Sequence, residues 1–538
     1  MVFSVAVAKI LGVLYIIPLT HLISNVGLGI YQNGYTLYMI LLTLATSGFP
    51  TAMGKLIAER LAKQTYDEAE QIFAVTMRTV GLLAVVSALV TWFGAPLFSR
   101  LVALRAPGQA VAALVPSIRA LAPAVLVVPF VSALRGYMQG FQRMDVSGYS
   151  QAIEQIFRVL TMILGAELVM HWHPHDYISG AAAATFGACL GAVAALLLLL
   201  FATAKLRRKL PQSRTLNRTM TNKEVRRLLW MVALPVSAGA MVVPISTLAD
   251  SFTVQNLLMW TGKFTFQQAT AEYGILSRQA VTLIQLPLTF ALAIGASILP
   301  AIASAITLKN YQRVQQTVKT TFRSMFFITL PMVACFLVLA GPLDWFLFST
   351  NQGEVIITSV SFMGIFSSLE LTSTFILQGY GEMYKPVRNM LLGVLVKVIL
   401  NFLLIWHFYI LGAAIATTIG YLFSSALNVL AVKKYGRIDF SVLKLATPSM
   451  IASFVMVIVL LVMKWGIAHF LPISPSHYLI PALVQILGSV AIGGVVYIAV
   501  SIRIRAVSAD ELHRLPAVGR YLEKMARRLQ PSHLRYND

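Results

Sequence analysis

The stretch YSQAIEQIFRVLTMILGAELVM, residues 149–170, combines an apolar run of membrane-spanning length with a stripe of polar side chains. The stripe comprises Ser150, Gln151, Glu154, Gln155 and Arg158. These positions recur at helical spacing, so they share one face of the predicted helix. Ionisable side chains inside a membrane span are costly and commonly mark functional sites. The stretch therefore predicts a membrane helix with a functional polar face.

The composition of the whole chain agrees with a membrane protein. Of its 538 residues, 58% are hydrophobic and 12% are charged, and the mean hydropathy is +0.76. Soluble domains carry about 25% charged residues, so an ordinary soluble protein is excluded. Cys189 and Cys335 both lie in apolar runs, which argues against a disulfide framework or a cysteine metal site.

The apolar runs predict an all-α polytopic protein with about fourteen transmembrane helices. Each run approaches the ~20 residues that a bilayer-spanning helix needs. The expected spans are 1–23, 34–54, 73–97, 113–134, 149–170, 178–203, 228–250, 273–305, 324–342, 355–378, 389–408, 410–432, 446–470 and 478–502.

The net charge of +22 is distributed unevenly between the two sides of the predicted membrane. The connections that follow even-numbered spans hold 24 Lys and Arg, and the C-terminal tail holds eight. The connections that follow odd-numbered spans hold only Arg100, Arg105 and Lys263. This positive-inside pattern predicts a multi-pass membrane protein with both termini in the cytoplasm and an even number of spans. The charge is explained by topology, so no nucleic-acid partner is expected. The first run lacks the basic segment that opens a cleavable signal peptide.

The spans suggest two pseudo-symmetric six-helix lobes followed by two additional helices. The predicted segments are an N-lobe at 1–204, a basic cytoplasmic linker at 205–227, a C-lobe at 228–435, the added helices at 436–502 and a basic amphipathic cytoplasmic tail at 503–538. The basic charges of the linker and tail are expected to lie near anionic lipid headgroups.

Three short sequence echoes link the two lobes. GlnGlyPhe at 139–141 resembles GlnGlyTyr at 378–380, and SerGlyPhePro at 47–50 resembles SerIleLeuPro at 297–300. GlyAlaAlaAlaAlaThr at 180–185 resembles GlyAlaAlaIleAlaThr at 412–417. The first echo has an offset of 239 residues, which places Arg158 opposite Lys397. Internal repeats with a site at their interface are common in secondary transporters.

Cations outnumber acids within the spans. The cationic candidates are Lys9, Arg119, Arg158, Arg278 and Lys397, and Gln151 and Glu154 accompany Arg158 on its stripe. If these side chains converge on one cavity, its natural ligand is an anion. Arginine suits phosphate because its planar fork donates two parallel hydrogen bonds, while lysine acts as a point charge.

Several of these residues have a structural explanation as well. Glu154 and Arg158 are separated by four residues and could neutralise each other on one helix. Arg119 and Arg278 lie near span ends and could extend toward the interface. Asp250 could close a helix end or, like Glu154, couple an ion to transport.

The sequence contains no catalytic constellation and no nucleotide-binding signature, so neither an enzyme nor a cofactor is expected. His171, His173 and His175 occupy a short external loop, and no metal site is expected there. A cation-coupled drug exporter remains an alternative, although its cavity would need carboxylates rather than cations. A membrane glycosyltransferase would need a clustered carboxylate or metal site.

Several motifs carry a family resemblance that extends over essentially all the spans. They are AKILGVLYIIP at 8–18, LATSGFP at 44–50, RGYMQG at 135–140, SQAIEQIFR at 150–158, YGILSR at 273–278 and LGAAIAT at 411–417. They resemble the YtgP/SpoVB branch of polysaccharide-type exporters, within the multidrug/oligosaccharidyl-lipid/polysaccharide superfamily. Within that branch the chain is most similar to the YtgP-type MurJ flippases.

The resemblance implies a V-shaped pair of lobes around a cationic cavity and transport by alternating access. It implies a lipid-linked oligosaccharide of the undecaprenyl-diphosphate type as substrate, most specifically lipid II, with another lipid-linked glycan or a sporulation-type role as the alternative. It also implies a monomer that works beside cell-wall synthesis proteins. Lys9 matches the family's basic first-helix position and Arg278 its eighth-helix cation. Many relatives have a second arginine where this chain has Tyr15 and Ile16.

Overall fold

The computed structural model describes residues 11–12, 15–46, 48–104, 106–208, 220–474 and 477–504. These residues form helices throughout and contain no strand, only an isolated bridge between Ser474 and His477. The helices are α2 Ile16–Thr46, α3 Gly48–Ala62, α4 Tyr66–Val102, α5 Gly108–Ala120, α6 Ala122–Gly140, α7 Met144–Trp172, α8 Tyr177–Arg207, α9 Asn222–Ala240, α10 Val242–Trp260, α11 Phe266–Gly274, a π-helix Ile275–Ala280, α12 Val281–Thr307, α13 Tyr311–Phe348, α14 Glu354–Gly379, α15 Tyr384–Gly436, α16 Val442–Phe470 and α17 Leu479–Arg503. The predicted all-α membrane fold is confirmed.

Ten helical stretches of the described chain are long and apolar enough to cross a membrane. They are fewer than the fourteen predicted spans partly because α15 covers two of them, 389–408 and 410–432. A non-helical residue, Tyr409 with φ 51°, separates the two halves of α15 at the predicted boundary. The ten do not include α7, whose polar stripe lowers its hydropathy.

The sequence prediction was wrong about the connection expected at residues 24–33. The backbone breaks only at Ser24, where φ is 58°, and α2 then continues as a helix to Thr46. The glycines of this segment serve helix packing rather than a turn. A Cβ added at Gly29 would overlap the Thr270 carbonyl oxygen, so only glycine permits this approach of α11 to α2.

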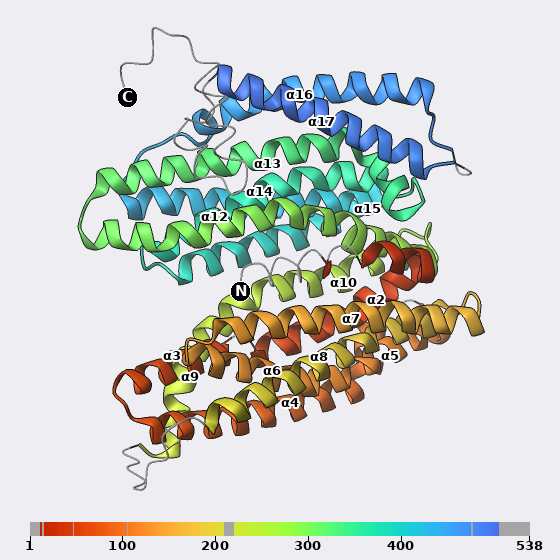
Figure 1. The fold of residues 1–538 in the computed structure, drawn as a ribbon. Helices are drawn as coiled ribbons and strands as arrows, with labels where there is room; N and C mark the ends of the chain where they lie inside the picture. The colour runs from red at the N-terminus through yellow and green to blue at the C-terminus, as the bar shows by residue number, and fades with distance from the viewer. Residues whose placement is uncertain are drawn as a thin grey trace. The chain divides into compact units, whose positions relative to one another are not determined.

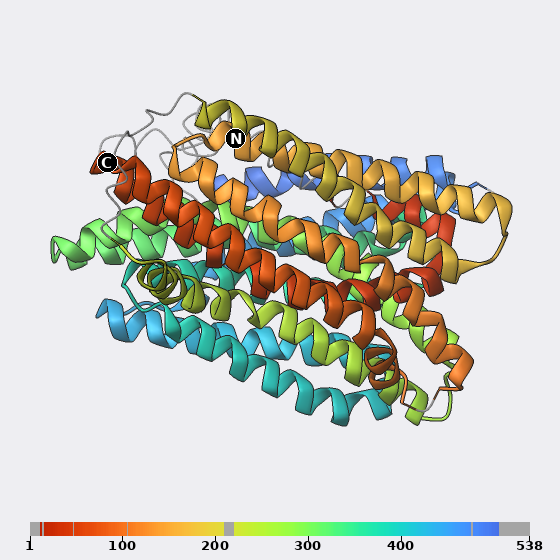
Figure 2. The same ribbon diagram turned by 90° about the horizontal axis from the view of Figure 1, so that it is seen from below.

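The chain divides into two compact units, Met1–Arg278 and Gln279–Asp538. Residues 228–278, which the sequence analysis placed in the C-lobe, therefore pack with the first unit in this structure. The lobe boundaries themselves stay a prediction. Within the first unit α7 and α8 run side by side along most of their lengths (Figures 1 and 2).

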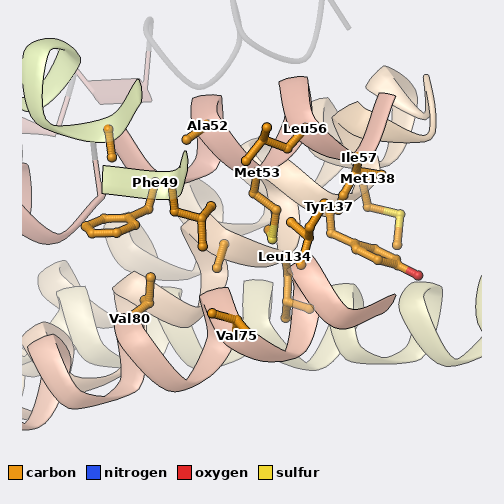
Figure 3. Packing of buried hydrophobic residues seen from close by; sticks show 14 of the residues in the cluster. Phe49, Ala52, Met53, Leu56, Ile57, Val75, Val80, Leu134, Tyr137 and Met138 are labelled. Carbon is orange, nitrogen blue, oxygen red and sulfur yellow. The ribbon is translucent and has the colours of Figure 1, made fainter. Parts of the chain in front are cut away.

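Each unit has its own apolar core. In the first, Phe49 and Met53 of α3 meet Val80 of α4 and Leu134 and Tyr137 of α6 (Figure 3). All five are at least 99% buried. Burying such side chains contributes about 1.5–3 kcal/mol each relative to leaving them exposed. This core holds α6, and therefore the base of the site described below, against α3 and α4.

The two additional C-terminal helices pack on α13 in the second unit (Figure 1). Phe327 of α13 stacks near Tyr497 of α17, with ring centroids 5.4 Å apart. The Tyr497 hydroxyl donates a 2.7 Å hydrogen bond to the Phe327 carbonyl. Met456 and Leu460 of α16 complete this cluster, so α16 and α17 are joined to the unit by a buried core of their own.

Two glycines reveal the internal repeat at the level of helix contacts. A Cβ added at Gly191 of α8 would lie 2.8 Å from the Arg158 Cβ and 2.6 Å from the carbonyl oxygen four residues before Arg158. A Cβ added at Gly420 would lie 3.0 Å from the Lys397 Cβ and 2.9 Å from the carbonyl oxygen four residues before Lys397. The two cations, which the offset of 239 residues pairs, thus occupy matching environments within their own units.

Candidate functional site

The site in the first unit begins with a row of tyrosines on one face of α2. Tyr31, Tyr35 and Tyr38 follow at helical spacing. The rings of Tyr31 and Tyr35 stack with centroids 5.8 Å apart, and those of Tyr35 and Tyr38 lie 5.3 Å apart. Tyr15 meets Tyr31 edge-on at 6.5 Å. We call these four side chains the tyrosine row.

Arg278 lies over one part of the tyrosine row. Its Cζ is 4.7 Å from the Tyr31 ring centroid and 4.6 Å from that of Tyr35. Its Nη1 donates a 3.2 Å hydrogen bond to the Tyr15 hydroxyl. Arg278 belongs to the π-helix that interrupts the eighth predicted span, and π-turns inside helices frequently occur at functional sites. Cation–π contacts on two rings hold its guanidinium in a fixed orientation.

Arg158 approaches the same row from α7. Its Nη2 donates a 3.2 Å hydrogen bond to the hydroxyl of Tyr38. The two arginines, which lie 120 residues apart in sequence, therefore contact neighbouring members of one aromatic row. The tertiary structure brings together two of the predicted cations.

Both guanidinium groups retain buried donors that nothing in the described part of the chain satisfies. These atoms are Nε of Arg158 and Nε and Nη2 of Arg278. Leaving a charged donor buried without an acceptor is costly, commonly more than the 1–3 kcal/mol of a neutral group. An oxyanion can accept from adjacent guanidinium N–H groups in parallel. The arrangement is therefore chemically suited to bind an anion such as a diphosphate.

Glu154 does not form the local pair with Arg158 that its spacing allowed. Its Oε2 accepts a 2.7 Å charged hydrogen bond from Nη2 of Arg135 on α6. Nε of Arg135 donates to Ser150 Oγ, also at 2.7 Å. Both partners of the ion pair are 14% exposed. The acid of the stripe is therefore matched by a cation from a neighbouring helix, and Arg158 keeps its charge for other partners.

Sequence reasoning missed Arg135. The fourth span was predicted to end at residue 134, which assigned Arg135 to a cytoplasmic connection, but α6 continues to Gly140. A signal was present, because Arg135 opens the RGYMQG motif and no proline lies between Arg135 and Gly140. The interhelical pair could not be read from spacing, since its members are separated by 19 residues.

The two glutamines of the stripe, Gln151 and Gln155, also lie on α7. Gln155 Nε2 would lie 3.5 Å from a Cβ added at Gly12, so Gly12 lies beside the stripe. Gln151 is half-buried on α7. Lys9 falls outside the described residues, and its role stays a prediction.

Arg119 is the predicted cation that the structure places elsewhere in the first unit. Its Nε donates to the Trp92 carbonyl at 3.3 Å, and its Cζ lies 5.4 Å from the Trp92 ring centroid. Trp92 is 46% exposed. Arg119 therefore contacts an outward-facing tryptophan of α4, as expected for a side chain that extends along the helix surface.

Asp250 lies on α10 beside a buried polar network. The Ser251 hydroxyl is 2.8 Å from the Tyr273 hydroxyl and 3.2 Å from the Thr36 hydroxyl. This network joins α10, α11 and α2 within the first unit. The ion-coupling roles suggested for Asp250 and Glu154 stay predictions, and no group of three metal-ligating side chains occurs among the described residues.

Lys397 lies in the second unit and is 4% exposed. A polar cluster occupies the same unit around Glu370 of α14, whose Oε1 accepts from Thr374 at 3.1 Å and from Asn428 at 3.4 Å. Asn389, on the face of α15 that also carries Lys397, donates to Asn428 at 2.9 Å. The convergence of Lys397 with the two arginines in one cavity stays a prediction.

Comparison with known proteins identifies what the chain resembles. Residues 1–306 match the family model described as polysaccharide biosynthesis protein. The chain is 26% identical over 522 residues to the Bacillus subtilis (strain 168) protein named lipid II flippase MurJ, with 95% of each chain covered. It is 24% identical over 523 residues to stage V sporulation protein B of the same organism, with 96% of each covered.

The fold has a solved counterpart as well. The structure titled lipid II flippase MurJ, inward closed conformation, aligns with a TM-score of 0.65 at 14% identity. The alignment covers 94% of this chain and 98% of that one. The two chains therefore share a transporter fold across nearly their whole lengths.

Proposed function

Because the chain belongs to the polysaccharide biosynthesis protein family, as its motifs predicted, we propose a transport function for it. We propose that it is a flippase for a polyprenyl-diphosphate-linked cell-wall precursor, most specifically lipid II. The observation that carries the proposal is the pair of arginines, Arg158 and Arg278, whose buried N–H groups lack acceptors in the described chain beside the tyrosine row. The similarity to a protein named lipid II flippase supports the choice of precursor.

In this proposal the arginines bind the diphosphate. Each guanidinium is oriented by tyrosine, Arg278 through two rings and a hydroxyl and Arg158 through one hydroxyl. An oriented fork loses less freedom on binding than a flexible side chain, which strengthens recognition of a planar pair of oxygens. Tyr35, the member of the row that is only half-buried, offers its ring and hydroxyl to the sugars, while the polyprenyl chain stays in lipid.

The remaining predicted residues take supporting roles. Lys9, Gln151 and Lys397 stay predicted ligands of the head group. Glu154 is held by Arg135 in the present conformation, which keeps its negative charge away from the phosphate. Arg119, seated on Trp92, is not proposed as a primary ligand.

Transport would proceed by alternating access at the bacterial plasma membrane, with the head group entering from the cytoplasmic side and leaving outside. No covalent chemistry is required. Each positive charge that crosses the membrane field carries about 2.3 kcal/mol per 100 mV, so the membrane potential could return the empty cationic carrier. The protein would act as a monomer and receive its substrate beside cell-wall synthesis proteins.

The test is depletion of the protein in its host, followed by measurement of lipid II in each leaflet. We expect lipid II to accumulate on the inner leaflet. The charge-removing variants R158Q and R278Q should fail to relieve the accumulation although they reach the membrane at normal levels. R119Q is the matched control, because it removes the same charge from the same unit and should restore transport.

Two results would overturn this proposal. Lipid II that stays fully accessible outside during depletion would exclude it as the substrate, and accumulation of a different lipid-linked glycan would identify the alternative. Normal transport by the R158Q/R278Q double variant would remove the anion-binding role of the arginines.

A further inference from the structure

A cationic cavity lies in the second unit. It has a volume of about 420 Å³ and is formed by three segments: α13, the end of α15 and the start of α16 with the connection before it. Its lining residues are Lys319, Lys433, Asp439, Phe440, Ser441, Lys444 and Leu445. The proposed transport function uses none of these residues.

An apolar cavity of about 300 Å³ adjoins the cationic one and shares Lys444 with it. Its other lining residues are Thr447, Pro448 and Ile451 of α16 and Ile504 after α17. The two cavities meet at Lys444; the lining of the first is basic and that of the second is mainly aliphatic. We call the two cavities together the α16 groove.

The charge of the groove is predominantly positive. Three lysines face one carboxylate, Asp439, whose nearest oxygen is 3.6 Å from Nζ of Lys433. The Asp439 side chain is 100% exposed. A pair exposed to this degree is weak and screened by salt. Lys319 and Lys444 have no carboxylate opposite them in the groove lining, so the basic end attracts an anion.

The groove lies at the level where lipid phosphates are expected. Lys319 precedes the predicted span 324–342, Lys433 follows 410–432, and Lys444 precedes 446–470. The distribution of positive charge assigns all three to the cytoplasmic side. Ile451 lies further along α16, inside its span, and is 50% exposed. The basic end would therefore face the headgroups and the aliphatic end the hydrocarbon.

We propose that the α16 groove binds an anionic phospholipid of the inner leaflet, with its phosphate among Lys319, Lys433 and Lys444 and one acyl chain along Pro448, Ile451 and Ile504. Basic pockets between transmembrane helices on the cytoplasmic side are suited to such headgroups. The lipid would contact α13, α15, α16 and the end of α17 at once. It would thereby strengthen the attachment of the two additional helices to the second unit.

The test uses the purified full-length protein in nanodiscs that contain equal amounts of phosphatidylglycerol and phosphatidylcholine. Lipids that remain bound after transfer to detergent are measured by native mass spectrometry. We expect preferential retention of phosphatidylglycerol. The triple variant K319Q/K433Q/K444Q should lose this preference by tenfold or more, since each lysine near an anionic surface contributes substantially to attraction.

The matched control is K309Q/K385Q/K434Q, which removes three charges from the same predicted face but from outside the groove lining. It should keep the preference of the unaltered protein. I451Q should weaken retention of phosphatidylglycerol without changing the protein's charge, because it places an amide along the acyl path. Unchanged thermal melting of these variants in detergent shows that the changes in retention do not reflect unfolding.

Three results would overturn the proposal. Equal loss of preference in the control triple variant would mean that the total charge of the face, rather than the groove, attracts lipid. Unchanged retention in I451Q would mean that no acyl chain lies along the groove. Competition by millimolar inorganic phosphate at the same lysines would identify a phosphate site rather than a phospholipid site. None of these results depends on which substrate the protein transports.

Discussion

The Arg135–Glu154 pair stabilises the fold and also keeps the charge of Glu154 away from Arg158. Replacing Arg135 by glutamine tests both roles. In the native structure the carboxylate of Glu154 accepts from Arg135 across two helices at 2.7 Å. Without Arg135, the nearest cation on the same helix face is Arg158, four residues along α7. A carboxylate and a cation at this spacing are neighbours on a helix surface. R135Q therefore transfers the negative charge of Glu154 toward the proposed phosphate ligand.

The expected loss of stability in R135Q follows from the burial of the Arg135–Glu154 pair. Removing one partner of a buried ion pair costs 3–5 kcal/mol, and the 14% exposure of both side chains places this case near the lower end. We expect R135Q to lower the free energy of unfolding by about 3 kcal/mol. E154Q should cost a similar amount. The double variant R135Q/E154Q should cost at least 1 kcal/mol less than the sum, because residues in direct contact are not additive.

Two assays are needed. Unfolding in mixed detergent micelles gives the double-mutant cycle, and flipping of fluorescent lipid II in proteoliposomes gives activity. R135Q should lose activity more severely than E154Q, because only R135Q leaves an unpaired carboxylate beside Arg158. The double variant should recover activity relative to R135Q.

A coupling energy below about 0.5 kcal/mol, which is the usual scatter for independent sites, would show that the pair does not contribute as the geometry suggests. Activity that is lower in R135Q/E154Q than in R135Q would refute the idea that Glu154 must be kept from Arg158.

Three further predictions concern single positions. R278K keeps the charge but loses the planar group that lies over two rings, so its affinity for lipid II should fall at least severalfold, and that of R278Q further. In a lipid II binding assay, an R278K affinity equal to that of the unaltered protein would contradict the stacking role. G191A and G420A each insert a methyl group into a close helix contact, so each should lower the free energy of unfolding by about 1–3 kcal/mol. Unfolding in detergent measures this change, and no change in either variant would contradict the matched packing. D176A removes the side chain that caps α8 and should cost about 1 kcal/mol. Hydrogen bonds from Ser179 lower the pKa of Asp176 below its ordinary 3.8, so this contribution is fully present above about pH 4 and is lost as the pH falls through the lowered pKa. A D176A melting difference that does not shrink at all as the pH is lowered below about 4 would contradict it.

Much of the fold could be predicted because membranes impose a simple pattern. A bilayer requires about 20 apolar residues per span and internal satisfaction of every backbone hydrogen bond. The run at 149–170 therefore predicted a helix that the structure confirms as α7. The same reasoning failed at residues 24–33, which fell between two predicted spans but belong to α2, where Gly29 allows the close contact with α11.

In the candidate site too, some residues could be predicted from the sequence and others could not. Arg158 and Arg278 were recognisable because charges inside apolar runs stand out in a sequence. Arg135 was not recognised, because the end of an apolar run marks where hydropathy falls rather than where a helix ends. The tyrosine row was visible as spacing on α2, yet nothing in that spacing identified Arg278 as its partner.

By itself the sequence determined the all-α membrane class, the family and the identity of the cations that stand out within the spans. These properties follow from local composition, periodicity and motifs. Only the tertiary structure decided that Glu154 pairs with Arg135, that Arg119 lies on Trp92, and that two distant arginines share one aromatic row. The physical reason is that a helix fixes the spacing of its own side chains, whereas the choice of partner depends on how separate helices approach and pack.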